Sequence, residues 1–216
     1  MTIQVIKSIE ECISTPYEII IIDDNSDKET KDKMQKLVEN NHKIRILSYD
    51  YSIGVNQAWN LGVEESKWEY ILIINNDILL TPWIDIKLIK AFEDPNIKVS
   101  CPVSTRGNYA RQLPKFIKTD NICWWCYMVK KENNMFPIDD RLDIWYGDNW
   151  IYNMAGKEWV VHIKNTLIHH FESKTLKTKE QAEALWNRIE WDKLNREKIL
   201  QEKWWDNIES LYVNAV

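Results

Sequence analysis

The stretch YILIINND, residues 70–77, passes from a nearly continuous apolar run directly into two asparagines and an aspartate. Short apolar runs bounded by polar residues are typical of strands that are buried on both faces of a parallel sheet. The stretch YEIIIIDDNS, residues 17–26, has the same form and ends in a pair of aspartates, an asparagine and a serine. Ligands of open α/β sheets bind beyond the carboxyl ends of the strands. The two stretches therefore predict a sheet whose strands run into a polar site.

Helices and a further strand are expected between these two strands. Residues 27–41 are polar with apolar side chains at helical spacing, and residues 43–50 form a run that indicates a strand. Residues 54–66 are expected to form a helix that begins near Gly54. The order strand, helix, strand, helix, strand at this spacing predicts an α/β sheet with right-handed crossovers.

The rest of the chain is expected to add further strands and helices. We expect a helix over 81–96 closed by Pro95, strands over 98–104 and 122–129, a helix from Asn149, a strand leading to His169 and His170, and a C-terminal helix or helix pair from Lys179. Near the N-terminus, Ile6, Ile9 and Ile13 have helical spacing. We therefore predict one domain over 1–178 and a helical extension over 179–216 that packs on it.

The composition excludes several classes of protein. A chain of 216 residues with 44% hydrophobic residues can bury one core of ordinary size and is not wholly disordered. Its formal charge of −5 disfavours a surface that coats nucleic acid. The segment RGNYARQLPKFIK, residues 106–118, is basic and could meet phosphates, although a solvated loop is the favoured interpretation. The 12 tryptophans are mostly core residues, and they also favour carbohydrate binding because indole faces stack on sugar rings.

The sequence indicates a cytoplasmic location. No apolar run approaches the ~20 residues of a membrane span, and the N-terminus lacks the basic start and apolar block of a signal peptide. The four cysteines have no disulfide-framework spacing and agree with a reducing compartment. Cys123 and Cys126 form a C-x-x-C pair, but on a strand their side chains would point to opposite faces, and no second pair supplies further zinc ligands.

Five blocks of the sequence resemble, in this order, the family 2 glycosyltransferases of the GT-A fold: EIIIIDDNSDKET, GVNQAWNLG, YILIINND, IDDRLDIWYGDNW and HHFES. The resemblance covers nearly the whole chain, including the terminal WDKLNREKILQEKWW. It implies a Rossmann-like mixed sheet flanked by helices, with a C-terminal helical extension. It also implies transfer of a sugar from a nucleotide-diphosphate donor, with a UDP-sugar favoured, to a hydroxyl of a glycan, a protein or a modified nucleic acid.

The resemblance implies a metal site after the third strand. The departing diphosphate must be stabilised by a divalent cation, Mn²⁺ or Mg²⁺, which prefers oxygen ligands. Residues 75–77 occupy the place of the family's D-x-D motif, so Asp77 is the expected carboxylate ligand, whereas Asn75 offers only a neutral oxygen. A simple strand-ending turn is the alternative interpretation. His170 resembles the histidine that completes the metal site, and only one of His169 and His170 should face it.

The resemblance also implies the donor-binding residues, which are Asp23, Asp24, Gly54, Asn60, Asn75 and Asn76. The two aspartates correspond to positions that bind the base and the ribose of the nucleotide. Asn60 is expected either to contact the donor or to cap the surrounding helix. Ser52 departs from the family pattern, because asparagine is common at its position.

The block WYGDNW aligns Asp148 with the position of the catalytic base. A base that takes the proton of the acceptor hydroxyl contributes about 10²–10⁴ in rate, and the neighbouring aromatic rings are expected to raise the pKa of this carboxyl group. A surface aspartate that caps the helix from Asn149 is the alternative. Trp145, Trp150 and Trp125 are expected on the acceptor side of the site.

One departure from the family concerns the N-terminus. Family members usually begin with a strand and a loop that wraps the nucleotide base, and this sequence starts in the helix that follows them. Three explanations stay open: TIQVI, residues 2–6, forms a shortened strand; part of the nucleotide pocket is missing; or a neighbouring subunit of a homo-oligomer fills the gap.

Two other functions remain as alternatives. A degenerate relative that binds a nucleotide or a sugar without catalysis is suggested by Asn75 and by the missing first strand. A transferase that acts on modified DNA is suggested chiefly by the basic segment, and the negative net charge disfavours it.

Overall fold

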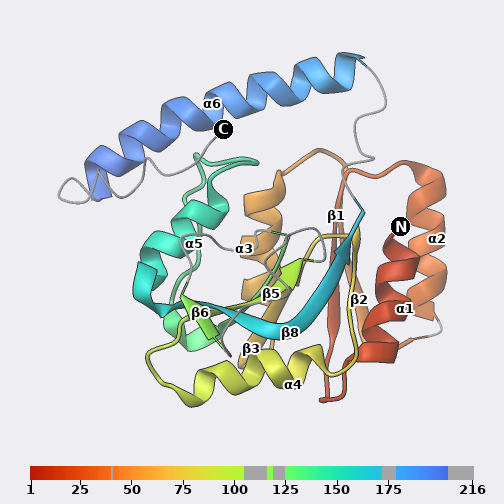
Figure 1. Cartoon of the computed structure of the whole chain (residues 1–216). Helices are drawn as coiled ribbons and strands as arrows, with labels where there is room; N and C mark the ends of the chain where they lie inside the picture. Colours follow the sequence, from red (N-terminus) through yellow and green to blue (C-terminus); the bar gives the residue numbers. More distant parts are fainter. Residues whose placement is uncertain (40, 105–115, 119–124, 172–178, 204–216) are drawn as a thin grey trace.

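The computed structural model describes residues 1–39, 41–104, 116–118, 125–171 and 179–203 (Figure 1). Predictions for Cys123, for residues 106–115 and for the chain after residue 203 lie outside these ranges. The described part is an α/β structure with a mixed sheet and surrounding helices, which confirms the predicted fold class. No helix within it is both long and apolar enough to cross a membrane.

The first element is helix α1, Thr2–Cys12. Its side chains Val5, Ile6, Ile9 and Cys12 are buried. The expectation that residues 2–6 form a shortened strand is therefore wrong. The apolar positions follow the helical period, so that burying them on one face requires a helix.

Strands β1, Ile19–Asp24, and β2, Ile44–Tyr49, are parallel, and helix α2, Lys28–Glu39, connects them. Among the described residues they form a two-stranded sheet of their own. The four isoleucines of β1 are half-buried, whereas the sequence predicted a strand buried on both faces. The difference has a structural reason: no described strand pairs with the second edge of β1.

The larger sheet has six strands in the order β3-β7-β5-β8-β4, with β6 beside β8. They are β3 Tyr70–Ile74, β4 Ile78–Leu79, β5 Val99–Ser104, β6 Phe116–Lys118, β7 Cys126–Lys130 and β8 Val160–His170. β8 is parallel to β5, whereas β7 is antiparallel to both β3 and β5. Alternate side chains of β3 enter different cores, with Ile71 and Ile73 in one and Leu72 against the other.

Helices cover both cores. α3, Val55–Glu65, and α5, Gly147–Ala155, pack into the core that contains Ile71. α1 and α4, Ile84–Ile89, pack into the other core, and α4 continues into the 3₁₀ helix η1, Lys90–Glu93. Two further 3₁₀ turns are η3, Lys131–Asn133, and η4, Lys157–Trp159. The helix expected over 81–96 is thus shorter and ends in a 3₁₀ turn before Pro95.

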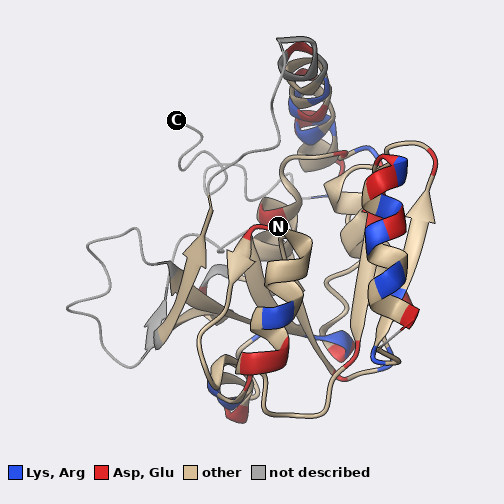
Figure 2. Cartoon of the chain, turned by 90° about the vertical axis from the view of Figure 1, so that its right-hand side faces the viewer, with Lys and Arg blue, Asp and Glu red and all other residues tan. Residues whose placement is uncertain are grey.

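Helix α6, Lys179–Lys203, crosses one end of the molecule (Figure 1). Among the α6 residues whose burial is described, the buried ones are Ile189, Asp192, Asn195, Ile199 and Leu200, and the first four follow one another at a spacing of three or four residues. Acidic and basic residues are interspersed along α2 and α6 without a block of one sign (Figure 2). Two of the five buried residues are polar, which indicates that α6 recognises specific partners on the domain in addition to covering apolar surface.

Candidate active site

A carboxylate and an imidazole meet where β4 pairs with the end of β8. His170 Nε2 lies 3.2 Å from Asp77 Oδ2, and the Trp125 ring stacks on the imidazole with ring centroids 4.9 Å apart. His169 instead packs edge-on against Phe171. Of the two adjacent histidines, His170 is therefore the one that contacts Asp77.

The chemistry of this pair fits a divalent cation. Asp77 Oδ1 is buried and has no hydrogen-bond partner among the described residues, so this oxygen still requires a ligand. Carboxylate oxygen and imidazole nitrogen both bind first-row divalent metals. Within the described ranges, no group of three or more His, Cys, Asp or Glu side chains could hold a metal. Asp77 and His170 would thus supply two ligands, and phosphate and water would supply the others.

The asparagines before Asp77 have different environments. Asn75 is half-buried, and its backbone N–H donates to the carbonyl of Trp125 at 2.9 Å, which extends the β3–β7 ladder. Asn76 is exposed in a turn. Their contacts with a donor stay predictions.

Asp148 lies in the first turn of α5, where the helix dipole favours a negative charge. Burial raises the pKa of its carboxyl group above the ordinary value, and the backbone N–H groups of Asn149 and Asp148 oppose this shift. Burial, and then the charge of Asp148, raise the pKa of the Tyr127 hydroxyl well above its ordinary value. This hydroxyl is buried and has no hydrogen-bond partner among the described residues. Asp148 is half-buried and Tyr127 is fully buried, and burial raises the pKa of both groups.

Strand β7 connects these two residues with the Asp77–His170 pair. Trp125, which stacks on His170, directly precedes the strand, and Tyr127, the second residue of the strand, is the one whose pKa the charge of Asp148 raises. The described contacts do not join Asp77 directly to Asp148.

The two aspartates of β1 have different environments. Asp23 is buried; its Oδ1 accepts the backbone N–H of Ser26 at 3.2 Å, and its Oδ2 has no partner among the described residues. Asp24 is exposed; its Oδ2 accepts the Ser52 hydroxyl at 2.8 Å, and its Oδ1 accepts the backbone N–H of Ile53 at 2.5 Å. Asp24 is therefore the aspartate that a solvent-borne ligand can reach.

Two glycines allow the start of α3 to approach the start of α5. At Gly54, where φ is 83°, a Cβ would lie 1.9 Å from Asp143 Oδ1, and at Gly147 it would lie 2.0 Å from Asn56 Oδ1. Asn56 also donates its side-chain N–H to the carbonyl of Trp145 at 2.9 Å. Gly54 therefore has a structural reason to be glycine, whether or not it contacts a donor.

We expect Gly54→Ala to destabilise the fold. The added methyl group would collide with Asp143 and would require a positive φ, at a cost of about 1–3 kcal/mol or more. Urea denaturation measures the change in free energy of unfolding. Gly62→Ala is the matched control, because the nearest atom there is Ile22 Cγ1 at 4.0 Å and alanine is favoured inside α3. Equal stability of the two variants would contradict the steric argument.

The side chain of Asn60 is occupied by the backbone of Ile138. Its oxygen accepts the N–H of Ile138 at 2.7 Å, and its amide donates to the carbonyl of the same residue at 2.8 Å. It therefore anchors the segment that leads towards α5, and its contact with a donor stays a prediction.

The three tryptophans expected on the acceptor side are placed differently. Trp150 is 5% exposed, and its indole N–H donates to the carbonyl of Met135 at 3.1 Å. Its ring belongs to the core, which corrects the expectation that it faces an acceptor. Trp145 is 40% exposed, and Trp125 is half-buried beside His170.

Sequence reasoning did not identify the residues of α6 that hold the loop before Asp148. Asp192 is fully buried, and its carboxylate accepts the backbone N–H groups of Asp143, Ile144 and Trp145 at 2.7, 2.8 and 2.7 Å. Three N–H donors satisfy a buried carboxylate that would otherwise be strongly destabilising. In the sequence, Asp192 looks like any charge on a mixed helix, so no local signal could have found it.

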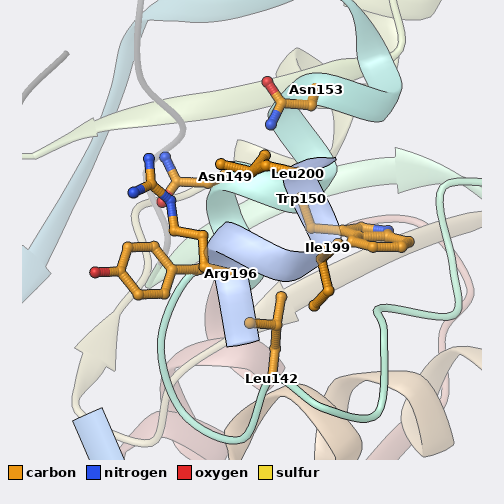
Figure 3. A pocket seen from close by; sticks show the side chains of 8 residues that line it. Leu142, Asn149, Trp150, Asn153, Arg196, Ile199 and Leu200 are labelled. Carbon is orange, nitrogen blue, oxygen red and sulfur yellow. The ribbon is translucent and has the colours of Figure 1, made fainter. Parts of the chain in front are cut away.

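A small cavity lies between α5 and α6 (Figure 3). It is lined by Leu142, Tyr146, Asn149, Trp150, Asn153, Arg196, Ile199 and Leu200. The guanidinium carbon of Arg196 lies 4.9 Å from the centre of the Tyr146 ring. Neither Asp24 nor Asp77 lines this cavity, so it belongs to the contact between the two helices.

The fold is shared with solved nucleotide-sugar transferases. The mannosyltransferase PcManGT from Pyrobaculum calidifontis, solved with GDP-Man and Mn²⁺, matches with a TM-score of 0.67 and 14% identity, over 81% of this chain and 54% of that one. GalNAc-T7, solved with UDP, GalNAc and Mn²⁺, matches with a TM-score of 0.64 and 15% identity, over 77% of this chain and 40% of that one. At these identities the likeness shows the fold, which is the GT-A fold.

The family model described as Glycosyl transferase family 2 matches residues 3–159. The chain therefore belongs to glycosyl transferase family 2, as the five sequence blocks predicted. A relative, the GalNAc(5)-diNAcBac-PP-undecaprenol beta-1,3-glucosyltransferase of Campylobacter jejuni, is 29% identical over 111 residues, which are 50% of this chain and 36% of that protein. The chain thus spans about a third of that relative's length.

Proposed function

We propose that the protein is an inverting, metal-dependent glycosyltransferase that moves a sugar from a nucleotide-diphosphate donor to an acceptor hydroxyl. The observations that carry this proposal are the Asp77–His170 pair, in which a buried oxygen of Asp77 has no hydrogen-bond partner among the described residues, and the carboxyl group of Asp148 at the start of α5, whose pKa burial raises. Membership of family 2 and the GT-A fold support it. A UDP-sugar is the favoured donor.

Each residue has a role in this proposal. Asp148 accepts the proton of the acceptor hydroxyl while that oxygen attacks the anomeric carbon from the side opposite the diphosphate. Asp77 and His170 hold a divalent cation, Mn²⁺ or Mg²⁺, which when bound stabilises the charge on the departing diphosphate. Asn75 adds only a neutral amide oxygen. Asp23 and Asp24 bind the nucleoside, and the exposed ring of Trp145 offers a surface for an acceptor sugar.

A panel of nucleotide sugars tests the reaction class. With Mn²⁺ present, one donor is expected to be hydrolysed slowly to the nucleoside diphosphate, and chelation of the metal is expected to stop this reaction. Once an acceptor is found, NMR of the product should show the anomeric configuration inverted. Retention of configuration would contradict the role of Asp148 as a general base. Failure to turn over any donor with either Mn²⁺ or Mg²⁺ would contradict the proposal that the protein is an enzyme.

One observation favours a second function, which is binding of a nucleotide without transfer. Asn75 stands at the first position of the D-x-D motif and cannot supply a charged ligand. Calorimetry with UDP and GDP in the presence of Mn²⁺ separates the two functions. Binding without turnover of any donor would support the binding protein, whereas binding with turnover supports the enzyme.

A further inference from the structure

The guanidinium of Arg188, on α6, reaches the end of β1 through a chain of hydrogen bonds. Its Nη1 donates to Ser52 Oγ at 3.0 Å, and the Ser52 hydroxyl donates to Asp24 Oδ2 at 2.8 Å. A serine hydroxyl has one hydrogen and two lone pairs. Because its oxygen accepts from Arg188, its single hydrogen is directed to Asp24.

The guanidinium itself is held in a fixed plane. Its Nε and Nη2 donate to the two carboxylate oxygens of Asp143, and the second of these bonds is 2.6 Å long. Such fork-like pairing fixes orientation as well as distance. Asp143 is in turn positioned by its approach to Gly54 and by its backbone N–H, which binds Asp192. Arg188 is thus oriented by a rigid partner on one side and acts on Ser52 with its remaining nitrogen.

The charges around Arg188 favour the same arrangement as its hydrogen bonds do. The side chain of Asp143, followed by the charges of Asp24 and Asp192, raises the pKa of Arg188. The half-buried guanidinium therefore lies among three carboxylates and offsets their negative potential. Without it, an incoming diphosphate would meet uncompensated negative charge next to the nucleoside site.

We propose that Arg188 is a positioning residue of the donor pocket, which orients Asp24 through the Ser52 hydroxyl. This inference rests on the proposed role of Asp24 in binding the nucleoside. It gives a function to Ser52, the position at which the sequence departs from its family, because the short side chain of serine both accepts from Arg188 and donates to Asp24. It also makes α6, which lies beyond the residues matched by the family model, part of the donor site.

Calorimetry with UDP and GDP in the presence of Mn²⁺ tests this relay of hydrogen bonds from Arg188 through Ser52 to Asp24. Arg188→Gln and Ser52→Ala are each expected to weaken nucleotide binding about 10- to 150-fold, the effect of losing one hydrogen bond to a charged group. Because both substitutions break the same chain, the double variant is expected to bind no more weakly than the weaker-binding single variant. Arg188→Lys keeps the charge but loses the fork, so it should recover only part of the affinity.

The matched control is Glu202→Gln. Glu202 forms a two-bond ion pair between α6 and Arg141, with distances of 3.0 and 2.8 Å, and touches neither Ser52 nor Asp24. It is expected to leave nucleotide affinity within about twofold of wild type, as for an uncoupled exposed pair. If a donor is found, Arg188→Gln should raise its KM and leave kcat nearly unchanged.

The outcomes separate this inference from the proposed function. If the wild-type protein binds neither UDP nor GDP, the proposed donor site is wrong, and the relay is rejected with it. If the wild type binds one of them but Arg188→Gln and Glu202→Gln have equal affinities, Arg188 is only a docking residue of α6. If the effects of Arg188→Gln and Ser52→Ala multiply in the double variant, the two residues do not act through one chain.

Discussion

Asp148→Asn is expected to lower the rate of sugar transfer by about 10²–10⁴-fold, because amide nitrogen and oxygen cannot accept the proton of the acceptor hydroxyl. The substitution keeps the shape of the side chain at the start of α5, so the donor KM should change little. Initial rates with a saturating donor measure the effect. Asp140→Asn is the matched control, since Asp140 is an exposed acid of the same segment. Equal rates for both variants would show that Asp148 is not the base.

The pH dependence of the rate provides a second test of Asp148. Burial raises the pKa of its carboxyl group, so the residue loses its proton at a higher pH than an exposed aspartate does. The rate of transfer should therefore rise with pH through this raised pKa and then level off. The Asp148→Asn variant should lack this acidic limb. An unchanged acidic limb in the variant would assign it to another group.

Stability should respond in the opposite sense to activity. The folded state binds the proton of Asp148 more tightly than the unfolded state does, because the folded pKa is the higher one. Stability contributed by this group is therefore present at acidic pH and is lost as pH rises through the two pKa values. At neutral pH, Asp148→Asn removes a half-buried charge and should raise the melting temperature. In acid, where the carboxyl group is protonated, the difference in melting temperature between the two proteins should be smaller. A lower melting temperature at neutral pH would contradict the burial argument.

Asp77→Ala is expected to abolish the response to Mn²⁺ and to lower transfer by about 10²–10⁴-fold, since a bound metal contributes several kcal/mol of charge stabilisation. Asp77 is the only carboxylate among residues 75–77, so no neighbouring acid replaces it. Titration of the rate with Mn²⁺ and direct measurement of Mn²⁺ binding provide independent readouts. We expect the Asp77→Ala variant to lose both the dependence of its rate on Mn²⁺ and the direct binding of Mn²⁺.

The two histidines supply the control for the metal site. His170→Ala should weaken Mn²⁺ binding, because its Nε2 lies beside Asp77. His169→Ala should not, because this ring packs on Phe171. If the two variants bind Mn²⁺ equally well, the imidazole of His170 is not a ligand.

Much of the fold could be predicted from residues that are close in sequence. The run of four isoleucines followed by two aspartates predicted β1 and the place where it ends, and the spacing of apolar residues predicted α2, α3 and α6. Asp77 was singled out because it directly follows a strand, whereas the roles of His170 and Asp148 came from the resemblance of their sequence blocks to the family. These signals are local, since backbone periodicity and turn chemistry depend on near neighbours.

The tertiary structure decided which side chains meet. The half-burial of β1 depends on an edge that no described strand covers, and the core position of Trp150 depends on how α5 packs. Arg188 lies 136 residues from Ser52 in sequence, and no periodic pattern connects them. Contacts of this kind arise when whole elements pack and their few polar groups must find partners, which the sequence near each residue does not specify. The sequence alone therefore determined the elements and the candidate chemical groups, whereas packing determined which of those groups share a site and which residues orient them.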